Sequence, residues 1–353
     1  MASLWALVAA TIAHAQPFTA GERHLTATAP AAALRNRGDA SLRITLWYPA
    51  TARETQAIVG PVGSPIFILG AVARDAPFAD IEKRPVVLLS HGLGGSARQL
   101  TWLGSALARR GYVAIAVDHP GENSIDGISD VGAYTPWARA GDLSAALDAV
   151  LSRPDLASHA DSARVGVAGF ALGAYAALLE AGARSRFANL TAFCAGPRRD
   201  AMCDKQLEYP FDDRERREVL ARPALRELVA RENATMRDRR IRALFLIGPA
   251  FMQALAAPSL KRLDLPVGIV FGDADPIAPV ATNGAVAARL IPGATTQVLR
   301  GVGHYEFISE CGPGGPRVVG PLCTDGPESS RADAHAKTEG AAIAFFDATL
   351  GVR

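Results

Sequence analysis

Three stretches of this 353-residue chain carry residues that could perform nucleophilic catalysis. The first is Gly169-Phe-Ala-Leu-Gly, where a β-rich run (164–168) meets a small-residue turn and then a helical run (174–181). A strand, a tight turn and a helix in this order are typical of the elbow that exposes a serine at the centre of G-x-S-x-G. The central residue here is Ala171, so the scaffold for a nucleophile is present without the nucleophile.

The other two stretches supply an acid and a base after later apolar runs. Gly272-Asp-Ala-Asp-Pro follows one run, and Gly301-Val-Gly-His-Tyr-Glu-Phe follows the next. Asp275 and His304 therefore complete the chain order nucleophile, acid, histidine, as orienting carboxylate and general base. Asp273 competes with Asp275, but the fourth place of the motif, followed by Pro-Ile-Ala-Pro, favours Asp275 and leaves Asp273 as a turn or capping residue. Glu306 and Asp126, near candidate loops, are expected to be solvated.

Two backbone N–H groups could stabilise an oxyanion. Leu172 follows the nucleophile position at a helix N-terminus, where the helix dipole favours negative charge. Leu93 lies in the turn His91-Gly-Leu-Gly-Gly-Ser, whose glycines allow tight backbone geometry. Aromatic residues near these loops suggest a pocket for a hydrophobic acyl or aryl group, although ordinary core packing would use the same types: Phe170, Tyr134, Trp137, Phe251 and Tyr305.

The elements that must position these residues alternate between apolar runs and helical segments. This rhythm predicts an α/β fold, with a mostly parallel central sheet and helices on both faces. The expected strands are 85–90, 113–117, 164–168, 241–247, 267–271 and 295–299, with helices at 100–109, 141–152, 174–181, 251–260, 282–290 and 333–350. Two β-rich segments, 22–28 and 41–48, form a hairpin-like opening, whereas 50–84 gives no clear pattern.

The expected domain organisation is a signal peptide, one catalytic domain and an insertion within it. Residues 1–15 have an apolar core and an Ala-His-Ala site, which predicts secretion or a periplasmic location, and 16–353 form the domain. The charge-dense segment 187–240 interrupts the strand–helix rhythm, which favours a helical insertion or lid. An ordinary long crossover is the alternative.

Four cysteines allow three disulfide connectivities, and the short loops favour Cys194 with Cys203 and Cys311 with Cys323. Four free thiols are the alternative. Neither C-x-x-C spacing nor a nearby histidine pair indicates a metal site, and no cofactor is expected. A net charge of +2, without a basic stripe, argues against nucleic-acid binding. No apolar run is long enough to span a membrane, and the oligomeric state stays open.

Together these motifs, with Asp118-His-Pro-Gly, resemble the predicted dienelactone hydrolases and related platelet-activating-factor acetylhydrolases of the α/β-hydrolase superfamily. The resemblance covers about residue 22 to the C-terminus. It implies hydrolysis of a small-molecule ester, the expected partner, through an acyl-enzyme. Ala171 would stand at the nucleophile position, with Asp275 and His304 as acid and base and Leu93 and Leu172 as oxyanion donors.

The chain also departs from both families. Dienelactone hydrolases resemble this pattern with a cysteine nucleophile, which is absent from this elbow. The acetylhydrolases place the acid after the preceding strand, but here Gly248-Pro-Ala follows that strand without a carboxylate. Asp275 is therefore the better choice of acid.

Ala171 leaves two origins open, an engineered Ser→Ala or Cys→Ala substitution and natural loss of the nucleophile. Either way this form is expected to be inactive, because a methyl group cannot form an acyl-enzyme. The surrogate hydroxyls Thr101, Ser96 and Ser124 do not lie on an elbow. The alternative functions are a non-catalytic protein that binds an ester, lipid or acid in the same pocket, and a purely structural α/β domain.

Overall fold

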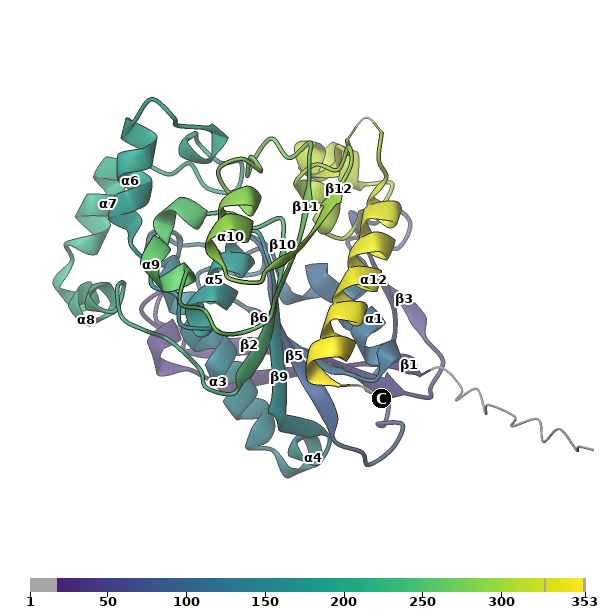
Figure 1. The fold of residues 1–353 in the computed structure, drawn as a ribbon. Coiled ribbons are helices and arrows are strands. Elements are labelled where there is room, and N and C mark those ends of the chain that lie inside the picture. Colours follow the sequence, from purple (N-terminus) through teal and green to yellow (C-terminus); the bar gives the residue numbers. More distant parts are fainter. Residues whose placement is uncertain (1–17, 327, 352–353) are drawn as a thin grey trace, which may run out of the picture.

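A single open β-sheet forms the centre of the protein (Figure 1). The computed structural model describes residues 18–326 and 328–351, so the expected signal peptide at 1–15 lies outside the described residues. The strand order is β12-β11-β10-β9-β5-β6-β2-β1-β4-β13, with β3 paired to β4. The strands are β1 Thr19–Thr28, β2 Ser41–Ala50, β3 Thr55–Val59, β4 Phe67–Arg74, β5 Arg84–Ser90, β6 Val113–Asp118, β9 Ala160–Phe170, β10 Ile241–Ile247, β11 Val267–Gly272, β12 Thr295–Leu299 and β13 Glu310–Cys311.

The strands from β6 to β12 form the parallel half of the sheet that the apolar runs predicted. Each neighbouring pair in the order β6-β5-β9-β10-β11-β12 is parallel. All six residues of β6 and the second half of β9 are buried, as expected for strands covered on both faces. The carboxyl ends of these strands therefore meet at one edge, which is where ligands bind in such sheets.

Mostly antiparallel pairs extend the sheet beyond β6. β1 and β2 pair antiparallel over ten residues, and β2 pairs antiparallel with β6. The segment 50–84, which showed no clear pattern, contributes β4, which pairs parallel with β1, and β3, which pairs antiparallel with β4.

Helices cover both faces of the sheet (Figure 1). On one face, α1 and the long α12 pack together, and α12 lies across β10, β11 and β9. On the other face, α3 and α5 pack against β5, β6, β9 and β10, and α10 packs against β11. The bounds are α1 Thr101–Arg110, α3 Arg139–Leu151, α5 Leu172–Glu180, α10 Gly284–Leu290 and α12 Arg331–Leu350. The fold expected from the sequence is thus confirmed.

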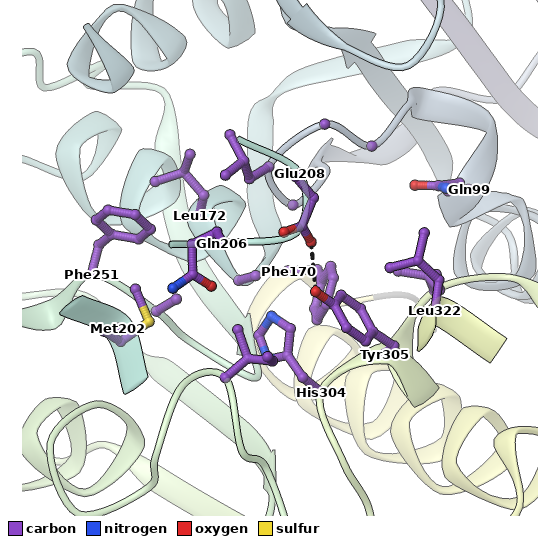
Figure 2. Close-up of a pocket in the computed structure, with 18 residues that line it drawn as sticks. Gln99, Phe170, Leu172, Met202, Gln206, Glu208, Phe251, His304, Tyr305 and Leu322 are labelled. Atoms are coloured by element: carbon purple, nitrogen blue, oxygen red, sulfur yellow. Dashed lines mark hydrogen bonds between the residues drawn. The ribbon is translucent and has the colours of Figure 1, made fainter. Parts of the chain in front are cut away.

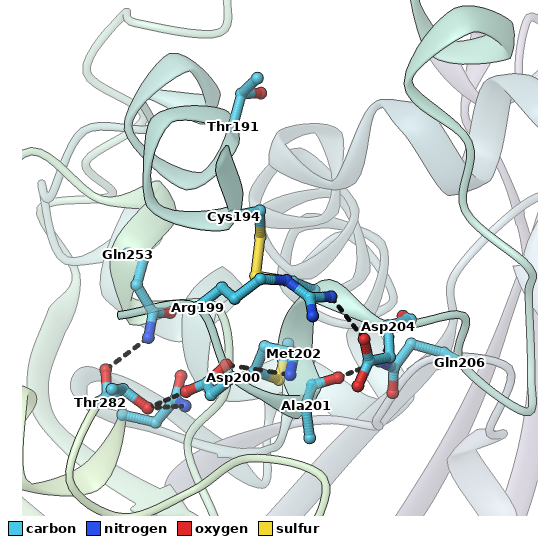
Figure 3. The surroundings of a disulfide bond; sticks show 12 residues. Thr191, Cys194, Arg199, Asp200, Ala201, Met202, Asp204, Gln206, Gln253 and Thr282 are labelled. Carbon is cyan, nitrogen blue, oxygen red and sulfur yellow. Dashed lines mark hydrogen bonds and ion pairs between the residues drawn. A yellow bond between two sulfur atoms is a disulfide. The ribbon is translucent and has the colours of Figure 1, made fainter. Parts of the chain in front are cut away.

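The segment between α5 and β10 contains α6 (Phe187–Ala195), α7 (Asp213–Leu220) and α8 (Arg226–Ala230). Its helices lie along the left side of Figure 1. α7 packs against α2 (Asp130–Tyr134). Figure 3 shows the Cys194–Cys203 disulfide that closes its central loop. Asp200 in that loop also hydrogen-bonds Thr282, just before α10, so the loop is tied to the main domain.

One element differs from expectation. A single helix over 251–260 was predicted, but the segment forms a 3-10 turn, Met252–Ala254, and a separate α9, Ala257–Leu260. Phe251 has a left-handed backbone with φ of 61°, and Leu255 is extended. Pro258 then lies in the first turn of α9, where it is tolerated, whereas the interior of a longer helix would exclude it.

Cys311 and Cys323 form the second disulfide of the described chain. Disulfides persist in oxidising compartments, so the two bridges indicate an extracellular or periplasmic protein. Within residues 18–326 and 328–351, none of the helices is long and apolar enough to cross a membrane.

Candidate active site

Ala171 occupies a strained turn between the end of β9 and the start of α5. Its backbone has φ of 51° and ψ of −115°, a conformation that costs an alanine roughly 1–3 kcal/mol. The turn is held by the Ala171 N–H, which donates to Ile247 O at 3.0 Å, and by the Ala171 carbonyl, which accepts from Ala174 N at 3.0 Å. The strain places the side chain at position 171 on the wall of a cavity.

The glycines on either side are required by close backbone approach. A Cβ on Gly169 would lie 2.2 Å from the carbonyl oxygen of Gly173. A Cβ on Gly173 would lie 2.0 Å from the carbonyl oxygen of Ser90, at the end of β5. The G-x-x-x-G spacing therefore lets α5 pack directly onto the two central strands.

His304 and Asp275 meet in a buried pair. His304 Nδ1 lies 2.6 Å from Asp275 Oδ2, and both side chains are almost fully buried. A carboxylate oxygen can only accept a hydrogen bond, so in the neutral ring of His304 the proton is on Nδ1. Nε2 then has a free lone pair and can act as a base. The other carboxylate oxygen, Oδ1, accepts the N–H groups of Ile277 and Ala278 at 2.9 and 2.8 Å, which fixes the direction of Asp275.

Burial disfavours the protonated ring of His304 and by itself would lower the pKa of this histidine. The ion pair and hydrogen bond with Asp275 outweigh the effect of burial, so the pKa of His304 is raised. The negative charge of Glu208 adds to this effect. The histidine is therefore a stronger base than an isolated imidazole.

The competing carboxylates have other partners. Asp273 Oδ1 accepts the Gly301 N–H at 2.7 Å, a loop-fastening role. Glu306, expected to be solvated, is fully buried and accepts the N–H groups of Gly303 and Gly326 at 2.6 and 2.9 Å. The solvated interpretation was wrong for Glu306, because these loop amides need an acceptor. Asp126, also expected to be solvated, is partly buried and pairs with Arg43.

The elbow, His304 and the glycine turn line one cavity of about 60 Å³. Figure 2 shows His304 beside Tyr305, with Phe251, Met202 and Gln206 around the same space. The walls come from three places, the carboxyl edge of the sheet, the loop after β12 and the insertion. The lining residues are Gly92, Leu93, Gly94, Gly95, Gln99, Phe170, Ala171, Leu172, Met202, Gln206, Glu208, Ala250, Phe251, Ile277, His304, Tyr305, Ile308 and Leu322.

Leu93 and Leu172 are among the residues that line this cavity. Leu172 is the first residue of α5, where backbone N–H groups have no partner inside the helix. Neither N–H makes a hydrogen bond to an acceptor in the described parts of the chain. Both are therefore available to a negatively charged oxygen in the cavity.

The aromatic residues expected around the substrate lie in different places. Phe170, Phe251 and Tyr305 line the cavity. Tyr134 lines a neighbouring cavity of about 280 Å³, which shares Met202 and Phe251 with the first. Trp137 lines neither of these cavities; it is fully buried and its Nε1–H donates to Leu228 O at 2.9 Å. Its expected role at the substrate is corrected to core packing under α8.

The sequence predicted a lid over 187–240 but singled out none of the residues from this segment that line the cavity. Figure 2 shows Glu208 reaching over the cavity to accept a hydrogen bond from the Tyr305 hydroxyl at 2.9 Å. Burial and this carboxylate raise the pKa of Tyr305, so its hydroxyl keeps the donated proton. Met202 and Gln206 come from the same loop. Only the tertiary position of this loop reveals them, because their spacing carries no motif.

Among the described residues, no cluster of three or more His, Cys, Asp or Glu side chains could hold a metal ion. The surrogate hydroxyls of Thr101, Ser96 and Ser124 do not line the cavity. The arrangement thus comprises a buried histidine–aspartate pair, two backbone N–H groups without a partner in the described chain, and a strained turn with an alanine at its centre.

Elbow, acid and histidine fall within residues 86–311, which match the alpha/beta hydrolase family. The chain therefore belongs to this family, and its sheet, helices and turns have the architecture of an α/β-hydrolase fold. The narrower resemblance to dienelactone hydrolases and acetylhydrolases stays a prediction.

Among solved structures, a ferulic acid esterase from Streptomyces cinnamoneus is similar to this chain, with a TM-score of 0.58. The two are 24% identical over 96% of this chain and 91% of the esterase. At this identity the likeness concerns the fold.

Proposed function

We propose that the protein is a carboxylic-ester hydrolase of the serine-hydrolase type whose present form is inactivated by Ala171. The observation that carries the proposal is the His304–Asp275 pair, which opens into the same cavity as a strained elbow. A surface histidine would need neither a buried carboxylate nor a neighbouring helix N-terminus.

With a serine hydroxyl at position 171, each group has a defined task. The oxygen attacks the ester carbonyl while its proton passes to His304 Nε2. The N–H groups of Leu93 and Leu172 stabilise the oxyanion. Collapse of the tetrahedral intermediate expels the alcohol, whose oxygen takes the proton from His304, and leaves the acyl-enzyme. Water, activated by the same histidine, then releases the carboxylic acid and restores the hydroxyl.

In the present chain the first step fails, because a methyl group has neither a lone pair nor a transferable proton. Loss of the nucleophile in such enzymes lowers kcat by about 10⁶-fold and leaves binding and oxyanion stabilisation. The expected residual reaction is slow attack by water on a bound ester.

The size of the cavity bears on the substrate. A cavity of about 60 Å³ is smaller than the roughly 150 Å³ that holds a benzene molecule. The aromatic-lined space behind Met202 and Phe251 is larger, about 280 Å³. We propose that a hydrophobic acyl or aryl group extends toward it when the insertion, acting as a lid, and the flexible Met202 side chain move.

The test is to make Ala171→Ser and measure hydrolysis of short, long and aryl p-nitrophenyl esters. We expect kcat/KM to rise by several orders of magnitude, up to about 10⁶-fold, over the parent. Ala171→Ser combined with His304→Ala is the matched control and should stay near the parent. Equal rates for Ala171→Ser and the parent across the panel would sink the proposal.

A second candidate is a non-catalytic binding protein that uses the same cavity. It is favoured by Ala171 itself, since the surrounding walls are intact around an inert residue. It predicts micromolar binding of an ester or its acid by the parent in calorimetry, without turnover after Ala171→Ser. The absence of binding heat for esters and products would count against it.

A further inference from the structure

A buried arginine binds backbone carbonyls of the glycine turn that contributes Leu93 to the cavity wall. Arg139, at the start of α3, is fully buried and pairs through Nε with Glu122 Oε2 at 2.8 Å. Its Nη1 donates to His91 O at 2.5 Å and its Nη2 to Gly92 O at 3.2 Å. One guanidinium therefore grips two successive carbonyls of the turn.

The carbonyl of Gly92 is bound from several directions. Besides Arg139, it accepts His91 Nδ1–H at 2.6 Å and the Gly95 N–H at 3.2 Å. His91 Nε2 accepts the His119 N–H at 3.1 Å, so the ring is neutral with its proton on Nδ1. Burial and the charge of Arg139 lower the pKa of His91, which agrees with that neutral ring.

Because the peptide unit is planar and trans, the hydrogen bonds that fix the Gly92 carbonyl also fix the orientation of the Leu93 N–H. The described chain contains no cis peptide bond, so the Leu93 N–H points opposite to the Gly92 carbonyl within the same peptide unit. Because the Gly92 oxygen is bound to Arg139, the Leu93 N–H points away from the guanidinium, and Leu93 itself lines the cavity. A cation on the carbonyl also withdraws electron density and makes that N–H a better donor.

We propose that Arg139, supported by Glu122 and His91, is the positioning residue for the oxyanion-binding N–H of Leu93. The role rests on the proposed function, since an oxyanion arises only if an ester is attacked. The planar fork matters because a lysine ammonium could not bind both carbonyls and Glu122 in one geometry.

A second buried network of hydrogen bonds joins Ser90, His119 and Asp142. It does not support a role in positioning the Leu93 N–H. Ser90 Oγ lies 2.8 Å from His119 Nε2, and His119 Nδ1 lies 2.9 Å from Asp142 Oδ2. These contacts mimic a catalytic triad, but Ser90 and His119 are fully buried and Ser90 lines no cavity among those described. Arg35 pairs with Asp142 there and has no bond to the His91 or Gly92 carbonyl.

The kinetic test uses Arg139→Lys in the Ala171→Ser protein. We expect kcat to fall about 10²-fold, the usual effect of losing one oxyanion donor, while KM changes less than about threefold. Arg35→Lys, which alters an equally buried arginine, is the control and should keep kcat within about threefold. A folded Arg139→Lys protein with unchanged kcat would overturn the proposal, as would an equal loss in both variants.

A structural test separates this inference from the proposed function. In the alanine parent, a crystal structure of Arg139→Lys should show the Gly92–Leu93 peptide rotated away from the cavity; an unchanged peptide plane refutes the positioning role. If Arg139→Lys does not fold, Glu122→Gln takes its place in both assays. For Glu122→Gln in the Ala171→Ser protein, a kcat lower by about tenfold supports the positioning role of Arg139, and an unchanged kcat refutes it. An inactive Ala171→Ser protein would reject the esterase while the peptide orientation still decides this inference.

Discussion

The backbone of Ala171 is strained, although an alanine side chain has no use for this conformation. Strained φ and ψ values persist where the surroundings determine them and where function uses them. Here the surroundings are intact, because Gly169 and Gly173 still allow the close approach of α5 to the strands. The strain at this residue therefore fits an elbow built for a reactive side chain.

At the same scale, Glu208 is expected to contribute, after Asp275, to the lower pH limit of the restored enzyme. Catalysis needs neutral His304, so activity is lost as pH falls through the histidine pKa. Asp275 and Glu208 both help to raise that pKa against the effect of burial. Glu208→Gln in the Ala171→Ser protein should therefore move the acid limb of kcat/KM to lower pH.

Tyr305→Phe is the control for this prediction. It removes the hydrogen bond to Glu208 but keeps the carboxylate charge, so the acid limb should stay where it is. A shift in Tyr305→Phe as large as that in Glu208→Gln would assign the effect to loop position rather than charge.

At the scale of elements, the packing of α5 on β5 and β9 decides whether the elbow exists. The Cβ of a Gly173→Ala variant would meet the backbone oxygen of Ser90 at 2.0 Å, and a backbone atom cannot move aside cheaply. We expect a loss of about 3 kcal/mol or more in the free energy of unfolding, measured by urea denaturation.

Gly340→Ala in α12 is the matched control, since an added Cβ there meets nothing within 4 Å. It should stabilise the protein by about 0.5–1 kcal/mol, because alanine is the better helix former. Similar effects of the two substitutions would contradict the close-approach explanation.

At the scale of the whole molecule, the two disulfides serve different parts. Cys311 lies in β13, at the end of the sheet, and its bridge to Cys323 spans 12 residues of sequence. Replacing both by serine should lower the free energy of unfolding by about 2–4 kcal/mol in urea.

The bridge between Cys194 and Cys203 has a similar loop but lies in the insertion, next to Met202 on the cavity wall. Removing this pair in the Ala171→Ser protein should raise KM for esters, because the loop that carries Met202 loses a constraint. Unchanged KM would mean that the insertion does not shape the substrate site.

Local patterns in the sequence determined most of the fold. Apolar runs and helical spacing predicted the six parallel strands, and the small residues around Ala171 predicted the elbow, because these signals depend on neighbours in the chain. The order of elbow, Asp275 and His304 followed from the same patterns. The alternative Asp273 remained open, since two carboxylates two residues apart cannot be separated by spacing alone.

Only the tertiary structure decided which side chains meet. It directs Asp275 to His304 and Asp273 to Gly301, buries Trp137 in the core, and brings Glu208 and Met202 from the insertion to the cavity. It also sets Arg139 behind the glycine turn, far in sequence from the carbonyls it holds. Such contacts depend on side-chain directions and long-range packing, to which no local pattern in a single sequence is sensitive.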